Sequence, residues 1–177
     1  MIDTAGWTDE LLFSTVLGHQ LKGIMLHNDL ANLSGFCGLH KLQKWHMCRV
    51  QEETENHLKT QAYYILHHQK MPIPEKGIVA SLIPNQAYST KTSEVKNDYR
   101  RKFVKDMMEK LKAWEDETIG LYLAANDYLY RNQNKDVMFF KKMLKETYKE
   151  YEDIVKCKQK LEILDYDIEE IMEIEKY

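Results

Sequence analysis

All seven histidines of the chain lie between His19 and His68, and residues 71–177 contain none. One of them, His57, ends the run Gln51-Glu52-Glu53-Thr54-Glu55-Asn56-His57. Imidazole nitrogens and carboxylate oxygens both bind metals, and residues three or four apart share one face of a helix. The spacing is therefore typical of a metal site inside a helical bundle, and any imidazole chemistry must come from the first part of the chain.

Four main helices are predicted to position these residues. The 177 residues include only seven glycines and three prolines, and Pro72, Pro74 and Pro84 lie close together. Because proline breaks helices, the long proline-free segments on either side favour an all-α protein. Apolar periodicity predicts helices over about 8–33, 39–69, 90–130 and 136–161, with Thr8 as the first cap. We expect a break within 96–102 and a short C-terminal helix over about 165–177.

The connections indicate how these helices are arranged in one domain spanning 1–177. The short turn at 35–38 predicts an antiparallel hairpin of the first two helices. The segment 71–89 is long enough to cross the whole bundle, which would make the second and third helices parallel. The predicted architecture is thus two antiparallel hairpins joined by a long crossover.

Several polar side chains are predicted to point into the bundle. Gln20 and His27 fall in the middle of the apolar stripe of the first helix. On the second helix, helical angles assign the inward face to the following residues: Met47, Val50, Thr54, His57, Leu58, Gln61 and Ile65. Buried polar groups need partners, so this set predicts either a hydrogen-bonded network or a metal ion.

Carboxylates from the other helices are less directly aimed. Glu53 lies roughly 70° from the centre of the second helix's face, and Glu115 flanks the stripe of the third. Glu146 lies about 120° from the stripe of the last helix, where a solvated position is the plainer interpretation. The pair His67 and His68 is expected to bind the last helix carbonyls or solvent, with a surface metal site as the alternative.

Composition narrows the classes of partner and compartment. The net charge of −3 is small and the charges are interspersed, so neither nucleic acid nor an anionic membrane is indicated. The acidic C-terminal segment also argues against DNA protection. Cys37, Cys48 and Cys157 form no CxxC pattern, which favours free thiols in a reducing cytoplasm. Because the chain has no basic, apolar leader and no long apolar run, we expect a soluble cytoplasmic protein.

The pattern resembles the ferritin-like superfamily. The run Gly38-Leu39-His40-Lys41-Leu42-Gln43-Lys44-Trp45-His46, followed by residues 51–57, is similar to the second helix of ferritins. Met71-Pro72-Ile73-Pro74 stands where their long crossover begins, and Phe139-Phe140-Lys141-Lys142-Met143-Leu144-Lys145-Glu146 resembles the start of their fourth helix. The resemblance implies a ferritin-like four-helix bundle, a homo-oligomer and a di-iron site.

Carried onto this chain, the implied ligand set is incomplete. Gln20 stands at the carboxylate position of the first helix, and His27 stands where ferritins often have a tyrosine. The Glu-x-x-His motif becomes Thr54-Glu55-Asn56-His57. Glu115 and Glu146 fall at the remaining carboxylate positions.

Two neutral residues in place of anions weaken binding of iron ions and disfavour ferroxidase activity. Glu53, four residues before His57, still offers a same-face pair that can hold one ion together with His27. Histidine-rich sites favour zinc, copper or nickel. We therefore predict a ferritin-like protein that binds iron or zinc. The alternative is a non-catalytic assembly or interaction protein that keeps the bundle without a metal centre.

Overall fold

The computed structural model describes residues 2, 4–74 and 95–167. It contains four helices, α1 (Asp9–Phe36), α2 (His40–His68), α3 (Asn97–Arg131) and α4 (Val137–Ile163), and these described residues form no strand. The predicted all-α class and the number of main helices are confirmed. None of the four helices is long and apolar enough to cross a membrane.

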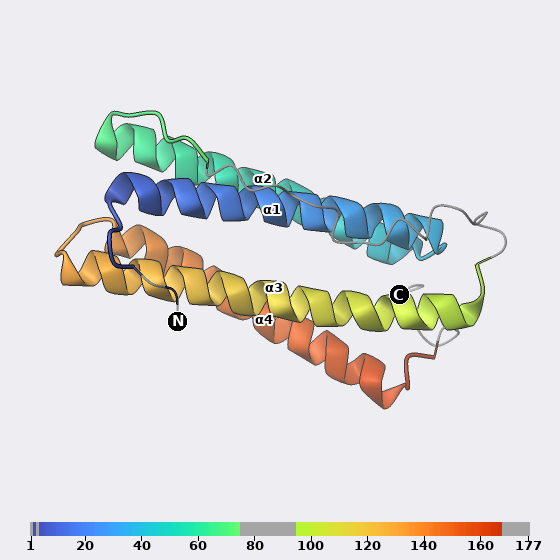
Figure 1. Ribbon diagram of the computed structural model, residues 1–177. Coiled ribbons are helices and arrows are strands. Elements are labelled where there is room, and N and C mark those ends of the chain that lie inside the picture. Colours follow the sequence, from blue (N-terminus) through green and yellow to red (C-terminus); the bar gives the residue numbers. More distant parts are fainter. Residues whose placement is uncertain (1, 3, 75–94, 168–177) are drawn as a thin grey trace.

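The helices pack as two antiparallel pairs, α1 with α2 and α3 with α4 (Figure 1). α2 ends and α3 begins at opposite ends of the bundle, so these two helices run in the same direction (Figure 1). This is the arrangement expected from a long crossover. The crossover residues 75–94 and most of the predicted C-terminal helix, 168–177, lie outside the described residues.

Local sequence explains where the helices begin and end. The Thr8 hydroxyl accepts a hydrogen bond from the Leu11 amide at 3.2 Å, as a helix cap should. Between α1 and α2 the backbone turns at Gly38, where φ is +74°, a conformation that costs glycine little. α3 begins at Asn97, inside the polar run where a break was predicted, and continues unbroken for 35 residues.

A polar layer divides the apolar core into two clusters. One cluster, at the end where α1 turns into α2, includes Leu30, Leu39 and Met107. The other, at the end where α1 begins, includes Phe13 and Phe140. Between them the buried residues are largely polar: His19, Gln20, Thr60, Glu115, Thr118 and Thr147.

The face of α2 that points inward differs from the prediction. Met47, Leu58 and Ile65, assigned to the core from the sequence, are 60%, 55% and 41% exposed. The residues that α2 buries are His46, Thr60 and Tyr64. These two faces are separated by about 110° around the helix axis. The prediction is wrong here because α2 contributes to the polar layer, so its inward face is not its most apolar one.

Candidate functional site

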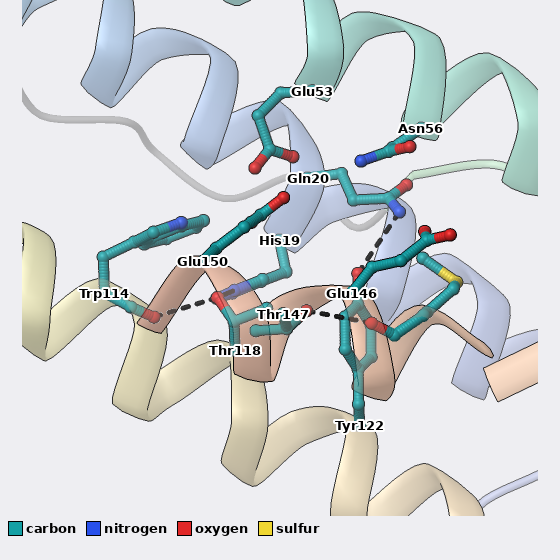
Figure 2. A pocket seen from close by; sticks show the side chains of 11 residues that line it. His19, Gln20, Glu53, Asn56, Trp114, Thr118, Tyr122, Glu146, Thr147 and Glu150 are labelled. Atoms are coloured by element: carbon teal, nitrogen blue, oxygen red, sulfur yellow. Dashed lines mark hydrogen bonds between the residues drawn. The ribbon is translucent and has the colours of Figure 1, made fainter. Parts of the chain in front are cut away.

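At the level of the polar layer, a cavity of about 20 Å³ lies between the four helices. This volume is enough for one water molecule or one ion. Figure 2 shows the side chains that surround it. They are His19 and Gln20 from α1, Glu53 and Asn56 from α2, Trp114, Thr118 and Tyr122 from α3, and Met143, Glu146, Thr147 and Glu150 from α4.

Carboxylates from α2 and α4 approach the cavity from different sides. Glu53 and Glu150 extend toward one another, and Glu146 lies one helical turn before Glu150 (Figure 2). Burial raises the pKa of Glu53 to about 7, with Arg49 acting in the opposite direction. Glu53 and Glu146 were predicted as site residues, and the structure places both at the cavity. Glu150 was not predicted as a site residue.

Arg49 compensates part of this negative charge. Its guanidinium donates to Glu150 Oε2 at 2.6 Å and to Glu52 Oε2 at 2.6 Å, and it lies 4.0 Å from Glu115 Oε1. Glu115 is 1% exposed, and burial, followed by the charge of Glu150, raises its pKa to about 8. Glu115 faces Arg49 and does not line the cavity. One cation therefore stands among several carboxyl groups, and two of these groups have unusually high pKa values.

Gln20 connects the cavity to α2 and α3. Its amide nitrogen donates to Thr60 Oγ1 at 3.0 Å and to the Tyr122 hydroxyl at 3.4 Å. Its carbonyl oxygen Oε1 is buried and has no hydrogen-bond partner among the described residues. The predicted inward position of Gln20 is confirmed. An unpaired amide oxygen beside a cavity of this size is a free ligand for a proton donor or a cation.

His19 forms one wall of the cavity and was not predicted as a site residue. Its Nε2 lies 2.8 Å from Thr118 Oγ1, and its ring stacks on Trp114 with centroids 4.0 Å apart. Burial lowers the pKa of His19 to about 4, so the imidazole is neutral at physiological pH. The stack depends on Gly23, because a Cβ there would lie 2.8 Å from Trp114 Cζ2. His19 thus acts as a packed, hydrogen-bonded wall of the cavity.

The structure does not bring His27 and His57 to one site. His27 is fully buried, and its Nδ1 lies 3.0 Å from Nδ1 of His46, whose Nε2 in turn lies 3.2 Å from Met107 Sδ. His57 is only partly buried, and its hydrogen bond is to the backbone of Leu17. Neither histidine lines the central cavity. The predicted combination of His27, Glu53 and His57 around one ion is therefore absent from the described arrangement.

Thr54 is likewise not among the residues that line the cavity, and its hydroxyl donates to the Val50 carbonyl of its own helix at 2.7 Å. The inward residues of α2 could have been found from a different signal. His46, Glu53 and Thr60 recur every seven residues, which places them on one helical face. A search for apolar periodicity passes over this polar repeat.

Fold and site together define the class of this protein as an all-α four-helix bundle with a polar layer across its core. Comparison with protein family models, with curated protein sequences and with solved structures finds no match. The bundle is compatible with a ferritin-like fold. The superfamily assignment rests on the sequence pattern alone.

Proposed function

We propose that this protein binds a single divalent metal ion, iron in the first instance, in its central cavity. The observation that carries the proposal is that Glu53, Glu146 and Glu150 all line a cavity of one-ion size, beside which Gln20 Oε1 has no hydrogen-bond partner among the described residues. All four offer oxygen atoms. Oxygen ligands suit Mg²⁺, Mn²⁺ and Fe²⁺ better than the softer ions that prefer thiolates.

Electrostatics also supports a cation at this level of the bundle. Charged carboxylates are costly to bury, and Arg49 supplies only one positive charge to Glu52, Glu115 and Glu150. In the metal-free protein, protons offset this cost, as the raised pKa values of Glu53 and Glu115 indicate. A divalent ion bound by Glu53 would replace the proton on that carboxyl group, so its binding should strengthen as pH rises.

The volume of the cavity favours binding over two-iron oxidation. A space of about 20 Å³ accommodates one ion or water, whereas a di-iron centre needs two metal ions and bridging ligands. Gln20 and Thr54 are neutral residues at two positions where a second ion would require carboxylates. The function that follows is the uptake or holding of one ion.

Anaerobic titration with Fe²⁺ followed by elemental analysis tests this proposal. We expect one bound ion per chain at pH 7.5, and at least tenfold weaker binding in Glu53→Gln. Glu55→Gln is the matched control, since Glu55 lies on the same helix and is exposed. Absence of bound iron in the unsubstituted protein between pH 6 and pH 8 would overturn the proposal.

Two observations favour a second function, that of an assembly protein without a metal centre. Arg49 donates to Glu150 at 2.6 Å and so partly fills the role of a metal cation. The exposed apolar residues Met47, Leu58 and Ile65 on α2 would suit a protein that works by association. We propose as the alternative a non-catalytic assembly protein without a metal centre. A homo-oligomer in light scattering, combined with no retained metal, would favour it over the first function.

A further inference from the structure

A second cluster of potential metal ligands lies at one end of the bundle, away from the central cavity. It combines Asp9 from the start of α1, His68 from the end of α2, and Asp136 from the turn before α4. These three helix ends meet at the same end of the bundle (Figure 1). One ligand atom from each residue lies within 4.8 Å of the other two. No other group of three such residues in the described part of the chain meets this criterion.

The side chains of the cluster are already held toward one another. His68 Nε2 lies 2.7 Å from Asp136 Oδ2. Asp136 is fully buried, and its second carboxylate oxygen accepts a hydrogen bond from the Tyr63 hydroxyl at 3.0 Å. Asp9 Oδ2 accepts a hydrogen bond from Asn134 Nδ2 at 2.9 Å. Outer hydrogen bonds of this kind orient the ligands of metal sites.

Charge and donor type together indicate which ion fits. An imidazole that binds a metal ion does so without its extra proton, so the two carboxylates give the ligand set a charge of −2, which a divalent ion would neutralise. Zinc accepts imidazole nitrogen and carboxylate oxygen as ligands, and water would take the fourth position. The ligand atoms of a tetrahedral zinc site lie about 3.3 Å apart, given bonds of about 2.0–2.1 Å. The His68–Asp136 pair would therefore open by about half an ångström, which side-chain rotation can supply.

We propose that Asp9, His68 and Asp136 form a zinc-binding site that ties the ends of α1, α2 and the α3–α4 turn together. The site is separate from the central cavity in position, because none of its three residues lines that cavity. The proposal stands whether or not iron binds at the centre.

Titration of the chelator-treated full chain with Zn²⁺ alone, followed by elemental analysis, tests the site. We expect one Zn²⁺ per chain, and at least tenfold weaker binding in His68→Gln. His67→Gln is the matched control, because His67 is the exposed neighbour of His68. Glu55→Gln, an exposed substitution on α2, should leave zinc binding unchanged, and His68→Gln should keep the Fe²⁺ binding that depends on Glu53, which separates this test from that of the central cavity.

Asp136 is so buried that its substitution can prevent folding, and Asp9→Asn provides the second variant. Asp9 is only partly buried, so its asparagine variant should fold, lose most Zn²⁺ affinity and lose the increase in melting temperature that Zn²⁺ gives the unsubstituted chain. Co²⁺ should give the visible absorption of a tetrahedral site in the unsubstituted chain and not in Asp9→Asn. The proposal is overturned if the unsubstituted chain binds no Zn²⁺, or if Asp9→Asn and His68→Gln both bind it unchanged.

Discussion

The buried pair His27 and His46 predicts a loss of stability in mild acid that a double substitution should remove. Both imidazoles are fully buried, with their Nδ1 atoms 3.0 Å apart. Burial lowers the pKa of His27 to about 2 and that of His46 to about 3. In the unfolded chain both rings take up protons near pH 6.5. The unfolded state therefore binds more protons than the folded state at every pH between about 3 and 6.5, and stability falls as pH falls through this window.

The size of the effect follows from the proton uptake of the unfolded chain. At pH 5, each ring that protonates only on unfolding lowers the free energy of unfolding by about 2 kcal/mol relative to neutral pH. The pair should therefore contribute a loss of about 4 kcal/mol between pH 7.5 and pH 5. This is a large fraction of the roughly 5–15 kcal/mol that stabilises a typical domain.

Urea denaturation of the double variant His27→Gln, His46→Gln measures this directly. Glutamine can form hydrogen bonds but does not titrate. The stability of the variant relative to the unsubstituted chain should rise by about 4 kcal/mol between pH 7.5 and pH 5. Taking this difference cancels groups common to both proteins, including Glu115, whose pKa is raised and whose protonation opposes the trend. A change of less than about 1 kcal/mol would show that the two imidazoles are already protonated to imidazolium in the folded protein at pH 5.

Three further predictions concern other parts of the core and surface. The free energy of unfolding of Glu115→Gln, relative to that of the unsubstituted chain, should increase by about 2–3 kcal/mol between pH 6 and pH 9. The reason is that Glu115 loses its proton near pH 8 and is then buried as an ion. No relative change over that range would mean that Glu115 is ionised throughout. Gly23→Ala should cost about 1–3 kcal/mol, since the new Cβ would lie 2.8 Å from Trp114 Cζ2; an unchanged urea midpoint would contradict this packing. Met47→Lys and Leu58→Lys should each change monomer stability by less than about 0.5 kcal/mol, because both side chains are exposed. A large loss of stability would show instead that these side chains are buried in the core.

The helices themselves were readable from the sequence because their signals are local. Thr8 caps α1 through its own backbone neighbour at Leu11, and Gly38 supplies the turn before α2. Apolar periodicity located all four helices to within a few residues at most ends. The largest difference between a predicted and an observed helix end, among the described residues, is the start of α3 at Asn97. The predicted helix began earlier, at about residue 90, because helix propensity alone extended it toward the N-terminus.

The site was only partly readable, because its contacts join residues far apart in the sequence. Gln20 was predicted from helical angles, Glu53 from its spacing to His57, and Glu146 from the resemblance to ferritins. Arg49 and Glu150 were not, since an ion pair that links α2 to α4 leaves no trace in either segment alone. The pairing of His27 with His46, in place of His57, has the same cause.

An amphipathic helix usually buries apolar residues and exposes polar ones, and α2 differs from this pattern on both its inner and its outer face. It places His46, Glu53 and Thr60 toward the core while it exposes Met47, Leu58 and Ile65. Buried polar groups cost stability and exposed apolar groups add little to it, so this distribution is not the one that folding alone would favour. An ion in the cavity would account for the inward Glu53, and a partner surface would account for the outward apolar residues. The two requirements are independent, so loss of metal binding in Glu53→Gln should leave association through the outer face of α2 intact.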